Sequence, residues 1–301
     1  MVPAHRLRQI LPVVWIVGSL AAILIAQQQN IPAGVAVPVT LAFLLEVSFY
    51  LGVRQVAGLQ PWMAAATALA AYLVFTVPTQ HFSWPALGAL AVLALAACYW
   101  LHLLPPSLDL LFLVFMGAVF LLKPFRWIYP DPMQELRVDA LGQLVWIRLG
   151  IGAFLRDRPE LDTGFGFLPA RKDWIEGARY FMLFLLPGIG AALLLRYVSF
   201  GLAEGWWWKG PATFAAFLWV GALSEEFFFR GVMQPKLGLV ATSIVFGLVH
   251  LPFREFPNWK HVLVATVLGY FCGLAYQKTG FIRAPTVTHA LVVATWRTFF
   301  R

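Results

Sequence analysis

Charged side chains are scarce in this sequence. Only 12% of its 301 residues are Asp, Glu, Lys or Arg, whereas 60% are hydrophobic. Soluble domains carry about 25% charged residues. Together with a mean hydropathy of +0.76, this scarcity excludes a chain whose whole surface faces water, and it indicates that lipid is the solvent. The 13 tryptophans suit a protein that is anchored at two water–lipid interfaces.

Cysteine is almost absent as well. Cys98 and Cys272 both lie inside apolar runs, and no CxxC pair occurs. This excludes a disulfide framework and a thiolate metal site, so we interpret each cysteine as a small buried hydrophobe. The net charge of +8 is spread over loops and segment ends without a stripe of basic and aromatic residues. It therefore predicts contacts with lipid headgroups and no nucleic-acid partner.

Apolar runs recur along most of the chain. The candidate membrane helices are 10–26, 34–53, 62–78, 84–104, 107–123, 178–199, 211–230, 237–253, 261–277 and 284–299. A membrane-spanning helix needs roughly 20 apolar residues, and two of these runs are short. We therefore expect an all-α, polytopic transmembrane bundle of about eight to ten hydrophobic helices, located in a bacterial inner membrane. Arg6 and Arg8 precede the first run, which lacks a small-residue cleavage pattern and is interpreted as a retained helix.

A more polar stretch divides the chain into three parts. Residues 1–123 form N-terminal transmembrane helices of unknown role, 124–177 a polar connector, and 178–301 a second group of helices. Within the connector, 135–156 has apolar residues near one face and predicts an amphipathic helix lying at the membrane interface. The glycines in 163–167 follow no predicted strand, so they do not indicate a dinucleotide site.

Ionisable residues within apolar runs are the candidates for function, because each costs roughly 2.5–3.5 kcal/mol to insert into a membrane. Two of them, Glu46 and Asp109, stand alone and are interpreted as structural. The others gather in the C-terminal third, on three separate segments: Glu225, Glu226, His250 and His289. A buried polar group without a partner is expensive, so we expect these side chains to meet inside the bundle.

The segment around Glu225 contains residues that can form an ion pair and, beside them, a carboxylate that need not take part in it. Glu226 and Arg230 are four residues apart and can form an ion pair on one helix face. Glu225 points about 100° away, which suits a general base that activates water. A salt-bridge network at a helix end, with His250 and His289 as core histidines, explains the same residues. One glutamate and two histidines also suit zinc, but no HExxH motif is present, so we favour a site without metal or other cofactor.

These motifs resemble the family of CAAX prenyl proteases and bacteriocin-processing enzymes, also called the ABI or CPBP family, over residues 175–301. Its EExxxR motif matches Glu225, Glu226 and Arg230, and its FxxxH motif matches Phe246 and His250. His289 begins the third motif, HxxxN or HxxxD, but Val293 occupies the last position.

The resemblance implies that 178–301 is the core of a glutamic-type intramembrane endopeptidase. Glu225 and His250 would activate water, and Glu226 and Arg230 would order the site. His289 would help to bind the oxyanion, normally with the residue that Val293 replaces. The expected partners are the lipid bilayer and a membrane-anchored peptide or protein substrate.

Val293 also leaves a second hypothesis open, a weak or inactive member that acts as a membrane scaffold or immunity-type protein. Another donor, such as Asn258 or Thr288, is a further possibility. A transporter predicts an inverted repeat, which the sequence does not contain.

Overall fold

The structure is a computed structural model that describes residues 4–134 and 136–301. The described residues form helices and one isolated β-bridge between Phe200 and Phe300, which confirms the all-α class. The chain divides into two units, Pro3–Glu160 and Leu161–Arg301, which are described separately. The side chains of Arg6 and Arg8, and all of Glu135, lie outside the described part.

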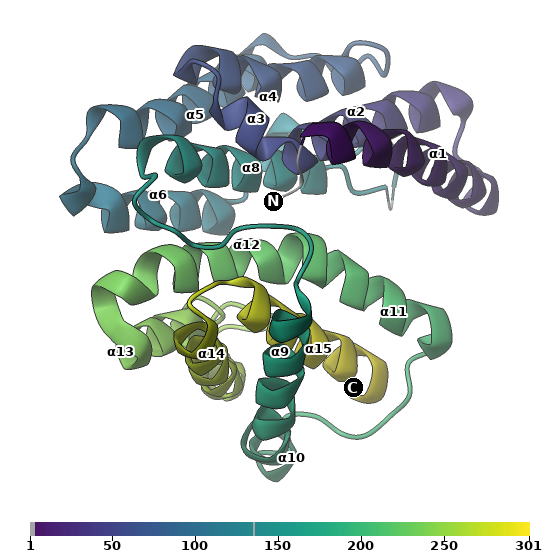
Figure 1. The fold of residues 1–301 in the computed structure, drawn as a ribbon. Helices are drawn as coiled ribbons and strands as arrows, with labels where there is room; N and C mark the ends of the chain where they lie inside the picture. The colour runs from purple at the N-terminus through teal and green to yellow at the C-terminus, as the bar shows by residue number, and fades with distance from the viewer. Residues whose placement is uncertain (1–3, 135) are drawn as a thin grey trace. The chain divides into compact units, whose positions relative to one another are not determined.

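The N-terminal unit packs its helices around α8 (Figure 1). Its helices are α1 (Ala4–Gln28), α2 (Ala33–Leu51), α3 (Val53–Ala57), α4 (Pro61–Thr76), α5 (Trp84–Leu103), η1 (Pro106–Leu108), α6 (Asp109–Leu122), α7 (Phe125–Ile128) and α8 (Asp139–Asp157). Contacts from α8 reach α2, α3, α5 and α7, and 12 of its 19 residues are buried. The helix predicted over 135–156 is thus observed over Asp139–Asp157, enclosed by other helices of its unit, and its place at the membrane interface stays a prediction.

Ion pairs explain why α8 is buried despite its charges. Arg148 is 1% exposed, and its Nε and Nη2 lie 2.5 and 3.0 Å from the carboxylate oxygens of Glu46. The Arg148 Nη1 also donates to Thr67 Oγ1 at 2.9 Å. In the same way Arg158 Nε donates to Asp109 Oδ1 at 3.0 Å. Glu46 and Asp109 thus have the structural role that was predicted, because each neutralises a buried arginine.

The C-terminal unit contains α9 (Arg171–Phe184), η2 (Leu185–Ile189), α10 (Gly190–Leu194), α11 (Trp206–Ala216), η3 (Phe217–Gly221), α12 (Ala222–Glu226), η4 (Phe227–Met233), α13 (Gln234–Leu248), α14 (Trp259–Thr279) and α15 (Arg283–Phe299). The three η segments of this unit are π-helical turns within longer helices. Gly238 has φ +79°, a conformation that favours glycine. It kinks α13 near its start, a few residues after the gap at 231–236 between two of the predicted segments.

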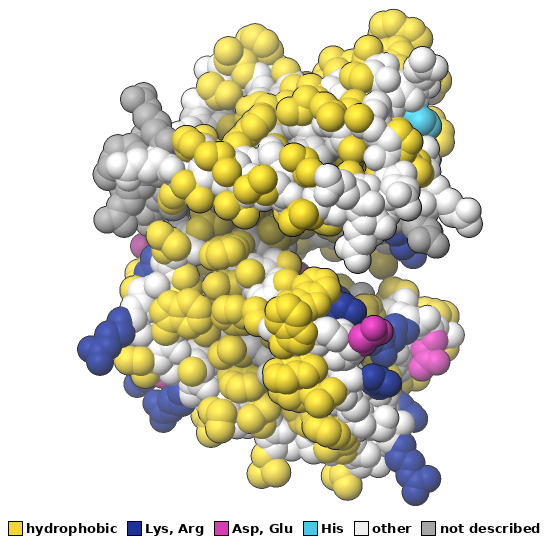
Figure 2. Space-filling model, turned by 90° about the vertical axis from the view of Figure 1, so that its right-hand side faces the viewer, with side chains coloured by type: hydrophobic (Ala, Val, Ile, Leu, Met, Phe, Trp, Pro, Cys, Tyr) yellow, Lys and Arg dark blue, Asp and Glu magenta, His cyan; other side chains and the backbone are white. Residues whose placement is uncertain are grey.

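Within residues 4–134 and 136–301, five helical segments are long and apolar enough to cross a membrane: Gln9–Gln28, Ala33–Leu51, Trp84–Leu103, Arg171–Leu194 and Trp206–Leu248. The predicted count of eight to ten is not confirmed. Large hydrophobic side chains remain exposed in both units, including Leu122 at 80% and Leu194 at 86%. Figure 2 shows such side chains extending over broad areas of one face. An apolar surface of this extent indicates a membrane protein.

Close packing of α9 against α15 fixes the helix that carries His289. A Cβ at Gly177 would lie 2.6 Å from the Cβ of Val287 and 2.8 Å from the carbonyl oxygen of Ala284. Only glycine permits this approach, as at many helix contacts in membranes. The same approach lets Thr288 Oγ1 donate to the Gly177 carbonyl oxygen at 2.9 Å.

Candidate active site

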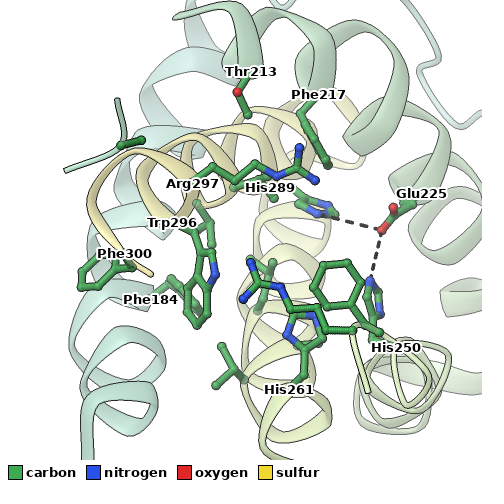
Figure 3. Close-up of a pocket in the computed structure, with 18 of the residues that line it drawn as sticks. Phe184, Thr213, Phe217, Glu225, His250, His261, His289, Trp296, Arg297 and Phe300 are labelled. Carbon is green, nitrogen blue, oxygen red and sulfur yellow. Dashed lines mark ion pairs between the residues drawn. The ribbon is translucent and has the colours of Figure 1, made fainter. Parts of the chain in front are cut away.

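The ionisable residues of the C-terminal unit meet around Glu225. Glu225 lies in α12, His250 lies two residues after the end of α13, and His289 lies in α15. The Glu225 Oε2 atom is 3.9 Å from the Nε2 atoms of both histidines (Figure 3). The three side chains therefore meet, as expected from the cost of burying each of them alone. Their chemical roles stay predictions.

Glu226 is a buried anchor for the site. Its side chain is 0% exposed, and its Oε2 lies 3.1 Å from Arg230 Nε. The Glu226 Oε1 lies 2.8 Å from His289 Nδ1. Arg230 in turn donates to the carbonyl oxygen of Gly269 at 3.1 Å. One carboxylate thus connects α12, η4 and α15, and Arg230 extends the connection to α14.

Phe246 explains the aromatic position of the FxxxH pattern. Its carbonyl oxygen lies 2.7 Å from His250 Nδ1, and its ring packs edge-on against His289, with centroids 5.7 Å apart. The Arg230 guanidinium carbon lies 4.7 Å from the centre of the same ring. Phe246 therefore contacts three of the polar side chains and limits how far each can rotate.

The contacts of the two Nδ1 atoms determine which nitrogens of His250 and His289 donate hydrogen bonds and which accept them. A carbonyl oxygen only accepts, so His250 Nδ1 carries the hydrogen and Nε2 is left as an acceptor in the neutral ring. The Glu225 carboxylate is also an acceptor, so neither group can donate to the other. A water molecule between them can donate one hydrogen to each. His289 directs Nδ1 to the Glu226 carboxylate, and its Nε2 faces the same position.

A cavity of about 680 Å³ opens beside these residues. The Glu225 side chain is 34% exposed and that of His250 22%, whereas the His289 side chain is only 4% exposed. The residues that line the cavity besides these three include Val293, Phe217, Phe246, His261, Trp296, Arg254, Arg297 and Lys209. Val293, which occupies the position of the expected second oxyanion donor, thus faces the cavity and contributes only apolar surface.

Neither of the alternative donors suggested by the sequence lines this cavity. Asn258 caps α14 by accepting from the His261 backbone nitrogen at 3.0 Å, and its amide donates to Tyr197 Oη and the Phe253 carbonyl oxygen. Thr288 donates to the Gly177 carbonyl oxygen. Both side chains form hydrogen bonds outside the cavity, so neither replaces the oxyanion donor that is missing at Val293.

Sequence reasoning missed His261, Arg254 and Arg297, which also line the cavity. The His261 ring stacks on Phe253 with centroids 4.5 Å apart. Its Nδ1 lies 3.0 Å from Tyr197 Oη. Arg297 lies eight residues after His289, which leaves the two side chains about 80° apart around the helix, so their spacing gave no clear signal of a shared site. Arg254 lies in a loop, where no periodicity exists to reveal it.

The arrangement does not fit zinc as it stands. Tetrahedral zinc with bonds of 2.0–2.1 Å brings ligand atoms to about 3.3 Å from one another, whereas Glu225 Oε2 is 3.9 Å from each histidine nitrogen. Within the described residues, no group of three His, Cys, Asp or Glu side chains is close enough to hold an ion.

Comparison with known proteins supports the resemblance noted in the sequence. An uncharacterized protein of Bacillus subtilis (strain 168), YpbD, is 34% identical over 73 residues, which is 24% of this chain. The chain thus spans 38% of the length of this curated relative. No solved structure matches the chain. Residues 206–295 contain the matched residues of all three motifs and Val293, and they match the family described as Rce1-like, type II CAAX prenyl endopeptidase. The predicted resemblance to the CAAX prenyl protease family is thus confirmed over this segment.

Proposed function

We propose that the chain is an intramembrane endopeptidase that hydrolyses a peptide bond of a membrane-anchored peptide or protein. The observation that carries the proposal is the position shared by Glu225, His250 and His289. The Glu225 Oε2 atom lies 3.9 Å from the Nε2 atom of each histidine, which is too far for a direct hydrogen bond and close enough for one water molecule to bridge. The match of residues 206–295 to an endopeptidase family supports the same reaction class.

In the proposed reaction, Glu225 and His250 accept hydrogen bonds from the water. The water oxygen attacks the carbonyl carbon of the scissile bond, and one proton passes to the Glu225 carboxylate. That proton then goes to the leaving nitrogen as the C–N bond breaks. The two carboxylates face the His289 ring, Glu226 at Nδ1 and Glu225 at Nε2, and two such acceptors favour a ring that carries a proton on each nitrogen. The protonated ring donates from Nε2 to the developing oxyanion.

Glu226 and Arg230 have a different role in this proposal. Their buried pair does not face the cavity and so does not act on the substrate. Glu226 holds the His289 ring through Nδ1, which fixes the direction of Nε2, as carboxylates do for other catalytic histidines. Both are therefore positioning residues.

Val293 supports a second candidate function. An oxyanion site normally has more than one donor, and loss of one typically lowers turnover by about 10²–10³. A valine in the cavity wall is the feature expected of a weak or inactive member that acts as a membrane scaffold or immunity-type protein. The intact set of Glu225, Glu226, Arg230, His250 and His289 favours the endopeptidase.

The test compares cells that express the wild-type protein with cells that express Glu225→Gln, using proteomics of new peptide termini in isolated membranes. Glu204→Gln is the control, because Glu204 is exposed and does not line the cavity. We expect a membrane protein that is cleaved with wild type and with the control, and not with Glu225→Gln. Identical termini in all three samples would support the scaffold function.

A further inference from the structure

The ring of His261 is held in one orientation in the cavity wall. His261 lies in the first turn of α14, where Asn258 Oδ1 accepts a hydrogen bond from its backbone nitrogen at 3.0 Å. The Phe253 ring stacks on the imidazole, with centroids 4.5 Å apart and 22° between the planes. The Tyr197 Oη lies 3.0 Å from His261 Nδ1. Stacking fixes the plane of the ring, and the Tyr197 contact fixes which of its edges faces the protein.

The contacts of Asn258 determine which nitrogen of His261 carries the hydrogen. The Asn258 oxygen accepts from a backbone N–H, and its nitrogen lies 2.9 Å from the Phe253 carbonyl oxygen, so the direction of the amide is fixed. The same nitrogen donates its other hydrogen to Tyr197 Oη at 3.2 Å. The Tyr197 hydroxyl then directs its own hydrogen to His261 Nδ1. In the neutral His261 ring, the remaining hydrogen is therefore on Nε2.

The surroundings of His261 favour the neutral ring. Its place in the first turn of α14 sets it beside the unpaired N–H groups of a helix N-terminus, which disfavour a positive charge. Arg254 and Arg297 line the same cavity and oppose protonation in the same way. In the described part of the chain, no carboxylate forms an ion pair with His261. His261 thus differs from His289, which two carboxylates face.

The Nε2–H group of His261 points into the cavity. Tyr197 does not line the cavity, so the Nδ1 that contacts it is directed into the protein. The two nitrogens of an imidazole ring point in nearly opposite directions. Among the described residues, Nε2 has no hydrogen-bond partner. His261 lies beside His250, with ring centres 5.5 Å apart (Figure 3). A free donor therefore lies next to a residue that faces the catalytic water.

We propose that the Nε2–H group of His261 binds a backbone carbonyl oxygen of the substrate. The inference rests on the proposed function, and it adds a residue that holds the peptide beside the catalytic water. A carbonyl oxygen fits because it accepts a hydrogen bond and brings no charge to a neutral ring.

The position of His261 limits which carbonyl this is. The His250 Nε2 lies 3.9 Å from Glu225 Oε2, and the His261 ring is the next one along the cavity wall. His261 thus lies within about 11 Å of the Glu225 carboxylate, which roughly three residues of extended peptide span. The bound carbonyl therefore belongs to a residue near the cleaved bond, and the oxyanion itself stays with His289.

The tautomer is tested by NMR of the full chain carrying Glu225→Gln, with isotope-labelled histidine, in detergent micelles. Long-range proton–nitrogen correlations show which nitrogen of each ring carries the hydrogen. The signals that His261→Leu removes belong to His261, and we expect a hydrogen on Nε2 and none on Nδ1 at neutral pH. Tyr197→Phe should give a mixture of the two tautomers, because the hydroxyl that donates to Nδ1 is gone. A hydrogen on Nδ1 in the parent protein overturns the proposal.

Binding is tested in the same protein with N-acetyl-leucine N-methylamide, an uncharged probe with two backbone-type carbonyl groups. The shift of the His250 signals during titration gives the Kd in every variant. We expect His261→Leu to weaken binding about fivefold, the usual effect of one neutral hydrogen bond. His261→Gln should keep most of the affinity, because its amide nitrogen replaces Nε2 as a donor. Lys260→Gln is the control and should leave the Kd unchanged, because Lys260 is exposed and does not line the cavity.

No binding of the amide, or an equal Kd with His261 and with His261→Leu, overturns the proposal. An equal loss in His261→Leu and His261→Gln also overturns it, because a donor in place of Nε2 then has no effect and the role of the ring is structural. An anion is the rival occupant. Protonation of both His261 nitrogens on addition of inorganic phosphate, without a response to the amide, assigns the ring to an anion and overturns the proposal as well.

The proposed function fails separately from this inference. Amide binding that depends on His261, in a protein that cleaves nothing, keeps the subsite and removes the endopeptidase. Peptide termini that disappear with Glu225→Gln, in a protein whose His261 does not respond to the amide, keep the endopeptidase and remove the subsite.

Discussion

The Nδ1 atom of His289 lies 2.8 Å from Oε1 of Glu226, and this contact joins two helices that are 63 residues apart in sequence. The same carboxylate pairs with Arg230 through its other oxygen. Glu225, the next residue back, pairs with no arginine of the described part of the chain and has a side chain that is 34% exposed. Two adjacent glutamates therefore stand in opposite environments, one anchored in the interior and one facing the cavity.

Glu226→Gln should destabilise the protein, because it leaves the buried Arg230 charge without its partner. Removing one member of a buried pair costs about 3–5 kcal/mol. Glu225→Gln should change stability little, since its carboxylate faces the cavity. Thermal unfolding in detergent, followed by circular dichroism, compares the two variants. Equal melting temperatures would contradict this division of roles.

The N-terminal unit contains an ion pair that offers an independent test. Glu46→Gln leaves Arg148 with its charge inside the bundle, so we expect a loss of about 3–5 kcal/mol. The double variant Glu46→Gln/Arg148→Met should recover part of that loss, because no charge remains to be compensated. Urea unfolding of the three proteins measures the difference. A single variant as stable as wild type would show that the pair contributes nothing.

Much of this fold is visible in the sequence because membrane burial leaves a simple signal. Apolar runs indicated α1, α2 and α5, and each is long enough to cross a membrane. The signal fails for α14 and α15, which pack against α9 and against each other. Helices enclosed by protein can carry polar residues such as Thr286 and His289, so their length and composition no longer report a membrane span.

Arg148 shows why the burial of α8 inside its unit could not be predicted from the sequence. A charged residue among apolar ones predicts a helix with one face exposed to water. This prediction assumes that the charged side chain is itself exposed. Here the charge is met by Glu46, 102 residues earlier in the chain. A partner that distant leaves no periodic signal. The site was easier to predict because its residues form short motifs, whereas Arg254 and Arg297 enter the cavity through the tertiary fold.

The distance between Glu225 and the two histidines predicts that strong chelators leave activity intact. If these side chains act directly on water, elemental analysis of the purified protein should find no stoichiometric zinc. Incubation with a chelator, followed by cleavage of the membrane protein identified by proteomics, should give the untreated rate. One tightly bound zinc per chain, with activity lost on removal and restored on return, would assign Glu225, His250 and His289 as ligands instead.

Val293 leads to the last prediction. It lines the cavity and lies four residues after His289, so both side chains share one helix face. Valine donates no hydrogen bond, and neither Asn258 nor Thr288 is placed to replace the donor. Val293→Asn should therefore raise the turnover of the identified substrate, by up to about 10²–10³ if the amide reaches the oxyanion. Val293→Ala is the matched control, because it makes room in the cavity without adding a donor and should not accelerate cleavage. An equal rise in both variants would mean that space limits the reaction. A folded Val293→Asn protein that is no faster would mean that another group, such as the Arg297 guanidinium, already stabilises the oxyanion.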